Sequence, residues 1–282
     1  MTKSRLLLFI AALSVLAVGL PATGQELPDS ILEIRLVDGS TLYGHVIDDG
    51  DPVRIRLLSG DEMSVARGRI RRMSPASGRV RDGEFWRDDP NLTRLFFSPT
   101  ARMLPRGRGY IAAYELAFPF VAYAATDDIM LAGGTPLFGG LDERIVYFAP
   151  KVRLYSDGVT DVAVGGLFFE ELGNSFSGAK AGALFGVLTR GSPDQAVTLG
   201  VAIGYDDDGF LDQPVVMLGG EFRLSRTIKL VTENYFVPDV TLLAIGPRFF
   251  GERLSADLGL AFAIEHGDDF FTLPLVNFVY VW

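Results

Sequence analysis

The last two thirds of the chain consist of segments of about nine to thirteen residues in which apolar and polar positions alternate. In the segment 144–155, Val146 and Phe148 share one face, whereas Lys151 and Arg153 share the other. Such segments have the length of a tilted strand that crosses the hydrocarbon layer of a membrane. A soluble β-sandwich alternates in the same way with its faces reversed, so alternation alone leaves both architectures open.

Three further features favour a membrane barrel. Short connections, such as 156–158 and 225–227, take turns with longer acidic ones, such as 170–178 and 206–213, as periplasmic turns and outer loops do. Aromatic residues gather at strand ends, where the two interfacial girdles of a membrane barrel lie. The final segment carries alternating aromatic residues that resemble the C-terminal signal for the barrel-assembly machinery, which makes this machinery an expected partner: Phe278, Tyr280 and Trp282.

The number of strands follows from counting these segments backward from Trp282. Eleven segments result: 270–282, 254–265, 239–250, 227–237, 213–224, 195–205, 178–189, 160–170, 144–155, 128–138 and 109–123. Single-chain bacterial barrels have even strand numbers, and the alternating stretch Thr93 to Ala101 supplies a twelfth. The sequence therefore predicts an all-β protein with a transmembrane antiparallel β-barrel of about 12 strands, with 10 as the alternative.

Residues 31–75 predict a separate small β domain. Apolar and polar residues alternate in short runs separated by hairpin turns such as Asp38-Gly39. Five short strands in about 45 residues resemble an SH3-like or Sm-like barrel, a likeness that carries no function. The predicted organisation is a signal peptide (1–24), a small periplasmic β domain (25–75), a linker (76–90) and an outer-membrane β-barrel (91–282).

The N-terminus has the three parts of a secretion signal. Lys3 and Arg5 precede the apolar run Leu6 to Leu20, and small residues follow at 21–24. A run of about 15 residues is short for a membrane helix, which needs roughly 20, although an N-terminal anchor is the alternative. The chain has no Cys, which excludes disulfides and thiolate metal sites. The expected location is the outer membrane of a Gram-negative-type bacterium, with the N-terminal domain in the periplasm.

Charge divides the expected mature chain into two regions. Residues 25–108 contain 14 Arg and no Lys and carry a net charge of +1, whereas residues 109–282 carry −12. The most basic stretch suggests contact with anionic head groups or an acidic envelope partner of the small domain, and a solvated strand face is the alternative. The signal peptide argues against nucleic acid. The arginines concerned are Arg67, Arg69, Arg71, Arg72, Arg79, Arg81 and Arg87.

One stretch of sequence carries a resemblance to a family. The residues Asn91-Leu92-Thr93-Arg94-Leu95-Phe96-Phe97-Ser98-Pro99-Thr100-Ala101, followed by Leu104, Gly107, Gly109 and Tyr110, resemble a recurrent opening in a poorly characterised family of bacterial outer-membrane β-barrel proteins. In that family a small N-terminal periplasmic β domain precedes the barrel. The resemblance covers most of the mature chain and implies this architecture, but no defined activity.

Charged residues on the inferred lumen faces are the main functional candidates. They have mixed signs, so they either line a narrow aqueous pore or pair with one another and fill the lumen. The candidates are Glu115, Lys151, Arg153, Lys180, Glu221, Arg223, Lys229, Glu233, Arg248 and Asp257.

The first functional hypothesis is a non-enzymatic barrel embedded in outer-membrane lipids. It would be either a narrow channel or an envelope-organising or binding protein whose small domain docks a partner. The alternative is a lipid or peptide hydrolase with His266 and nearby acidic residues at the outer rim, although an ordinary loop histidine explains the same pattern. A third hypothesis is a soluble periplasmic β protein. Asp206-Asp207-Asp208-Gly209 lacks the closing Glu of a calcium loop, so neither a metal nor a cofactor is expected.

Overall fold

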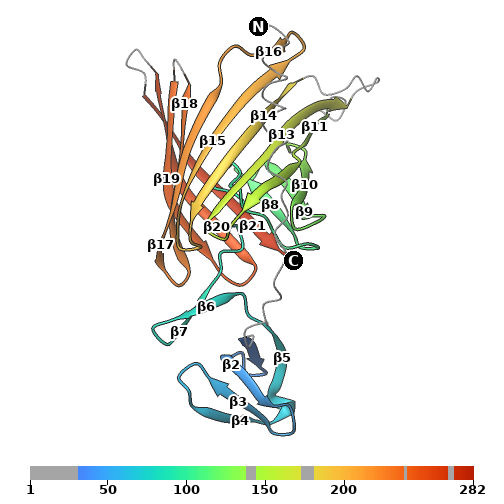
Figure 1. Ribbon diagram of the computed structural model, residues 1–282, viewed down its shortest axis with the longest axis vertical. Coiled ribbons are helices and arrows are strands. Elements are labelled where there is room, and N and C mark those ends of the chain that lie inside the picture. Colours follow the sequence, from blue (N-terminus) through green and yellow to red (C-terminus); the bar gives the residue numbers. More distant parts are fainter. Residues whose placement is uncertain (1–30, 138–143, 173–180, 238–239, 266–269) are drawn as a thin grey trace. The chain divides into compact units, whose positions relative to one another are not determined.

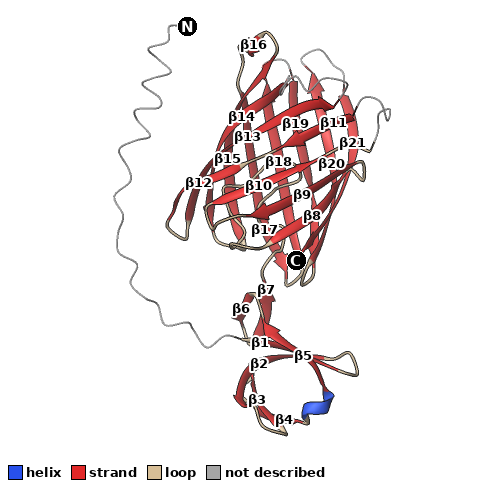
Figure 2. Cartoon of the chain, turned by 90° about the vertical axis from the view of Figure 1, so that its right-hand side faces the viewer, coloured by secondary structure: helices blue, strands red, loops and turns tan. Residues whose placement is uncertain are grey.

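The computed structural model describes residues 31–137, 144–172, 181–237, 240–265 and 270–282, and nearly all of its regular structure is β-strand (Figure 2). The chain divides into two compact units, one ending at Ala76 and the other running from Ser77 to Trp282. Among the described residues, no helix is long and apolar enough to cross a membrane.

The first unit is a five-stranded antiparallel sheet in the order β4-β3-β2-β1-β5. Its core contains Ile34, Val53 and Ile55, which are fully buried. Gly39 adopts a positive φ of 88° in the turn between the first two strands, as the sequence pattern requires. The five strands predicted between residues 31 and 75 are present: β1 (Leu32–Leu36), β2 (Thr41–Asp48), β3 (Val53–Leu57), β4 (Glu62–Val65) and β5 (Ile70–Pro75).

The second unit is a closed antiparallel barrel (Figure 1). Pairing of β9 with β10 closes its wall, and β11 and β12 together fill one position because both pair with β10 and β13. The wall therefore has twelve strands. They are β8 (Gly109–Tyr114), β9 (Phe118–Ala124), β10 (Ile129–Gly134), β11 (Arg144–Phe148) with β12 (Lys151–Ser156), β13 (Thr160–Leu172), β14 (Ala181–Gly191), β15 (Gln195–Asp206), β17 (Val215–Ser225), β18 (Ile228–Val237), β19 (Val240–Phe250), β20 (Leu254–Glu265) and β21 (Phe270–Val281).

The predicted strand number is confirmed, but two of the strand assignments are wrong. Residues 93–101 are not part of the wall, since their only ladder contact is an isolated bridge between Arg94 and Pro99. The segment 109–123 instead supplies two strands, β8 and β9, which are joined by a turn in which Glu115 and Leu116 have positive φ. A hairpin and a strand show the same alternation over nine residues, so this pattern could not distinguish them.

The two faces of the wall differ in the way expected for a membrane barrel. On β15, Val197, Leu199 and Val201 point outward and are 56%, 46% and 49% exposed. On the inward face of the same strand, Ala196 and Thr198 are buried. A soluble sandwich would bury the apolar face, so the arrangement is the reverse of a soluble core.

The two ends of the barrel are named here by their connections. The turn end carries the tight connections after β12, β14, β17 and β19, together with the start of β8 and the end of β21, and the opposite end is called the loop end. A short hairpin of β6 (Gly78–Arg81) and β7 (Glu84–Arg87) precedes the barrel, and β16 (Gly209–Phe210) extends from β15.

The wall is incomplete where β8 and β9 are short. β8 pairs only with residues 277–281 of β21, so residues 271–276 of β21 have no strand partner on that side among the described residues. The Glu115 side chain accepts a hydrogen bond from the Val276 backbone N–H at 3.1 Å, and two residues earlier Pro274 has no N–H to offer. Both features keep the free edge from pairing with another strand.

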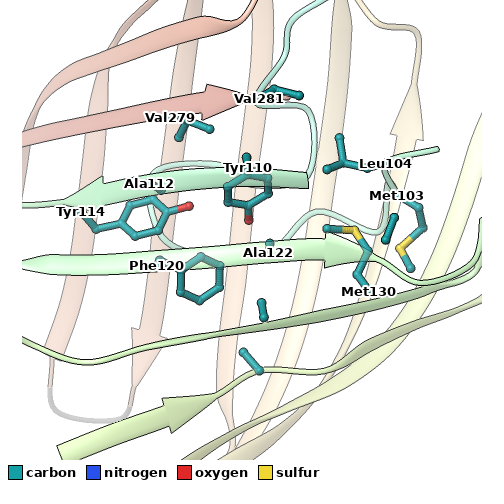
Figure 3. Packing of buried hydrophobic residues seen from close by; sticks show 13 residues of the cluster. Met103, Leu104, Tyr110, Ala112, Tyr114, Phe120, Ala122, Met130, Val279 and Val281 are labelled. Carbon is teal, nitrogen blue, oxygen red and sulfur yellow. The ribbon is translucent and has the colours of Figure 1, made fainter. Parts of the chain in front are cut away.

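Apolar residues of β8, β9, β10 and β21 form the largest buried cluster of the barrel (Figure 3). Tyr110 stacks on Phe120 with ring centroids 6.0 Å apart, and Tyr114 meets the same ring edge-on at 5.7 Å. Met103 and Leu104, which lie just before β8, complete the cluster. These contacts hold the chain against the inner wall where it enters the first barrel strand.

Candidate functional site

Residues 88–104, called the plug from here on, lie inside the barrel between β7 and β8. The plug turns back on itself, since the backbone N–H of Thr100 donates to the carbonyl of Thr93 at 2.9 Å. At its tip, Leu95 and Phe96 are fully buried among inward residues of β17 to β21. The lumen is thus filled over this length by the chain itself, as in small barrels with packed interiors.

Six charged side chains join the plug to the wall in one continuous chain of ion pairs. Two belong to the plug, Asp89 and Arg102, and four belong to successive wall strands β17, β18, β19 and β20. Along this chain, Asp257 pairs with Arg248 (2.6 Å), Arg248 with Asp89 (3.2 Å), Asp89 with Lys229 (3.0 Å), Lys229 with Glu221 (3.1 Å) and Glu221 with Arg102 (3.2 Å). Positive and negative groups alternate, so the three cations and three carboxylates neutralise one another away from water.

Asp89 is the central member of this chain. Lys229 and Arg248 lie directly opposite each other on β18 and β19, an arrangement of like charges that destabilises a sheet unless an anion separates them. One Asp89 carboxylate oxygen accepts hydrogen bonds from both cations. Burial alone would raise the pKa of Asp89, but Lys229 and Arg248 outweigh it and hold the pKa below its ordinary value.

Cations of the wall also bind the backbone of the plug. Arg248 donates to the carbonyl oxygens of Asn91 (2.8 Å), Arg94 (3.1 Å) and Leu95 (2.7 Å). On the other side of the lumen, the Lys151 ammonium donates to the carbonyls of Thr100 (2.9 Å) and Arg102 (2.7 Å). These carbonyls have no partners in a sheet, so the two cations satisfy acceptors that would otherwise be buried without a hydrogen bond.

The tip of the plug is held by an acid and two glycines of the wall. The Glu233 carboxylate accepts the backbone N–H groups of Phe97 (3.0 Å) and Ser98 (3.1 Å). Gly219 and Gly259 face Leu95 and Phe96, and a Cβ built on Gly219 would lie 2.1 Å from a Leu95 methyl carbon. Glycine at these positions therefore provides the space that the tip occupies.

At the turn end, Arg223 fixes the place where the chain enters the barrel. Its guanidinium lies 4.6 Å from the centre of the Phe250 ring and 5.4 Å from that of Trp86 on β7. It also donates to the carbonyls of Arg87 and Arg226, both at 2.6 Å. The β6–β7 hairpin is thereby attached to the barrel rim directly before the plug begins.

Beyond the plug, toward the loop end, the lumen contains a cavity of about 250 Å³. Most of its walls are apolar or small side chains from β10, β13, β14, β15 and β17, including Met130, Leu167, Ala183, Phe185 and Met217. The polar groups gather where the plug and its wall contacts form the floor, and these are Thr93, Arg94, Ser98, Tyr110, Lys151 and Tyr235. This combination of an apolar body with a few converging polar groups is typical of a small-molecule site.

The residues predicted to line the lumen have different positions in the structure. Five of them contact the plug directly: Lys151, Glu221, Lys229, Glu233 and Arg248. Arg223 binds the carbonyl of Arg87, the residue directly before the plug. Asp257 accepts hydrogen bonds from Arg248, which in turn binds the plug. Arg153 binds Asp128 near the turn end, and Glu115 lies in the β8–β9 turn against the edge of β21. Lys180 and His266 lie outside the described residues.

The residues on the plug side of this site were missed by the sequence analysis. Asp89 fell in the expected linker and Arg94 and Arg102 in or beside an expected wall strand. A signal was present in the excess of inward-facing charge, since a narrow lumen with this many charged groups needs counter-charges or hydrogen-bond acceptors. Among the described residues, no group of His, Asp or Glu has the arrangement of a metal site.

These features define a class of protein: a twelve-stranded antiparallel β-barrel whose lumen holds a segment of its own chain. No protein-family model and no curated protein matches the sequence. Similar solved structures include the KdgM porin in complex with disordered oligogalacturonate, at 8% identity and a TM-score of 0.44, covering 61% of this chain and 96% of that one. They also include a loop L8 deletion mutant of OmpT, an outer membrane protein of Vibrio cholerae, at 13% identity and a TM-score of 0.37, covering 89% and 96%. Likeness at this level leaves function open.

Proposed function

We propose that this chain is a non-enzymatic outer-membrane barrel that is closed to ion flow by its own plug and acts by binding a small molecule. Its small β domain would lie in the periplasm. Of the channel and binding roles that the sequence leaves open, the binding role has the stronger support.

Support for the membrane location comes from the outer surface of the wall. Apolar side chains of β15 such as Val197 and Leu199 are about half exposed, and those of β17 and β20 repeat the pattern with Leu218 and Leu258. Such a surface is stable in contact with lipid acyl chains and would aggregate in water. The expected signal peptide and the C-terminal aromatic residues point to the same membrane.

Support for a closed lumen comes from the chain of buried ion pairs, the single observation on which the proposal depends. Moving the plug out would separate Asp89 from Lys229 and Arg248, whose side chains are at most 1% exposed. Separating buried charges from their partners costs on the order of several kcal/mol, so thermal opening would be rare. The plug is thus expected to remain in place during the lifetime of the folded barrel.

The test is a conductance measurement in planar bilayers on two proteins. One is the full chain, and the other has residues 92–102 replaced by a Gly-Ser linker of equal length. We expect the full chain to give no discrete current steps and the linker variant to give them, since the plug is the segment that fills the lumen in the described part of the chain. Both proteins must show heat-modifiable migration, which establishes that the barrel is folded. Regular conductance steps from the full chain would overturn the proposal.

A further inference from the structure

We propose that the cavity above the plug binds a hydrophobic monocarboxylate, with Arg94 as the group that recognises the carboxylate. The proposal rests on the binding role argued above and names its ligand class. The body of the ligand would lie against the apolar walls of the cavity, and the single negative charge of the ligand would lie at the floor formed by the plug.

Arg94 is a cation without a carboxylate partner. Its Nε donates to the Tyr110 hydroxyl at 3.1 Å and its Nη1 to the Phe97 carbonyl at 2.6 Å. No carboxylate of the described residues lies within ion-pair distance of its guanidinium, unlike those of Arg102 and Arg248. Since a cation withdrawn from water is stabilised by a nearby anion, a cation that lines a cavity and has no ion pair indicates where an anion would bind.

One amino group of the Arg94 guanidinium is available to a ligand. Phe120 covers one side, with its ring centre 4.3 Å from the central carbon of the guanidinium. The Nη2 amino group makes no hydrogen bond with a described residue and is not among the fully buried atoms. Arg94 also lines the cavity, so Nη2 is the donor available to a ligand carboxylate.

The neighbours of Arg94 favour an anion over a cation. Lys151 lines the same cavity and is bound only to backbone carbonyls, with no carboxylate in ion-pair distance in the described part of the chain. The nearby acid Glu233 directs its oxygens to the backbone N–H groups of Phe97 and Ser98 and to the Tyr235 hydroxyl. The floor of the cavity therefore presents the Arg94 guanidinium and the Lys151 amino group, neither of which is in an ion pair with a described residue.

The rest of the cavity sets the character of the ligand body. Its walls offer side chains such as Leu167, Phe185 and Met217, which cannot satisfy sugar hydroxyls or amides. The volume of about 250 Å³ lies just below the usual range of ligand pockets, which is about 300 to 1,000 Å³. A slender alkyl or single-ring acid fits this description, whereas a polar oligosaccharide or peptide does not.

The experiment is calorimetric titration of the full chain in nanodiscs, with empty nanodiscs subtracted. The probes are octanoate, 1-octanol, octylammonium and 4-phenylbutyrate. We expect octanoate to bind at least tenfold more tightly than octanol, and octylammonium not to bind. The relative affinities of octanoate and 4-phenylbutyrate distinguish an alkyl from an aromatic acid, and a preference for either acid over octanol supports the proposal.

Three variants locate the site. Arg94→Gln should weaken octanoate binding at least tenfold, and Arg94→Lys should recover most of it because it retains the charge. Ala202→Phe fills the cavity without replacing Arg94, so it should abolish binding of octanoate and octanol alike. The matched control is Arg153→Gln, which removes a cation that is paired with Asp128 and does not line the cavity, and it should have no effect.

Each outcome has a separate meaning. Equal binding of octanoate and octanol, or unchanged octanoate binding in Arg94→Gln, would overturn the inference. If Arg94→Gln fails to fold, Ala202→Phe and Arg94→Lys still decide, since neither removes the positive charge. Conductance is measured in planar bilayers on the same purified proteins: a silent barrel without octanoate preference contradicts only this inference, whereas a conducting full chain contradicts the proposed function.

Discussion

Toward the turn end the lumen is occupied by the plug and carries a chain of six alternating charges, whereas toward the loop end its inward residues are largely apolar and partly exposed. Arg248 and Lys229 represent the first region and are fully buried. Leu242 and Leu273 lie on the inward faces of β19 and β21 in the second region and are 39% and 49% exposed. A single wall of twelve strands therefore encloses two different interiors.

The difference shows what each region is built to contain. A peptide backbone presents carbonyl and N–H groups, so the region that contains the plug supplies Arg248, Lys151 and Glu233 to bind them. An open aqueous pore would be polar along its whole length. The apolar second region is instead suited to a ligand body, and Arg94 and Lys151 lie only at the floor of its cavity.

The largest expected effect comes from Asp89→Asn, which would remove the central carboxylate from the chain of ion pairs. It leaves Lys229 and Arg248 facing each other without an anion between them, so we expect a loss of about 3–5 kcal/mol in the free energy of unfolding. Urea unfolding in detergent, followed by the fluorescence of Trp86 and Trp282, measures it. The same variant should show conductance steps in a planar bilayer.

The control for this prediction is Asp88→Asn, the neighbouring acid, whose side chain is 37% exposed. We expect it to change the unfolding free energy by less than about 0.5 kcal/mol. The Asp89 contribution should also be constant from about pH 8 to pH 5. A carboxyl whose folded pKa is depressed stabilises the protein above its unfolded pKa and loses this effect only as the pH falls through the folded pKa. Equal unfolding curves for both variants would mean that the ion pairs do not hold the plug.

A second prediction compares the same residue type in the two regions. Leu275 is buried on the inward face of β21 against the cluster that contains Leu95 and Phe96, whereas Leu242 faces the accessible part of the lumen. Leu275→Ala should cost about 2–4 kcal/mol, because it leaves a cavity beside the plug. Leu242→Ala should cost less than about 1 kcal/mol, because little packs against it. Similar costs, measured by the same urea unfolding, would remove the distinction between the regions.

Much of the barrel could be predicted from the sequence because a wall strand has a local signature. The period of two in segments such as 254–265 identifies the inward and outward faces, and the parity of bacterial barrels gives the number of strands. The four turns of the small domain are equally local, as Asp38-Gly39 illustrates. Each of these inferences needs only residues that are close in the sequence.

The plug could not be predicted in the same way because its partners are distant. Asp89 binds Lys229 and Arg248, which lie 140 and 159 positions further along the chain. The wall cations bind backbone carbonyls, and every residue has a carbonyl, so the sequence holds no sign of which segment is bound. At the start of this segment Thr93 and Leu95 are buried and Arg94 between them is less so, and a wall strand would give the same pattern.

The smallest effect concerns the fit between the plug tip and the wall. Gly219→Ala places a Cβ 2.1 Å from the Leu95 side chain and 2.8 Å from the Thr232 carbonyl oxygen, so the tip must shift. We expect a loss of about 1–3 kcal/mol in unfolding free energy, together with faster amide hydrogen exchange in residues 92–100. Gly186→Ala on β14 is the matched control, because a Cβ there meets no atom within 4 Å. If both alanine variants leave exchange in residues 92–100 unchanged, the tip does not depend on the glycine surface, and the ion pairs alone account for its position.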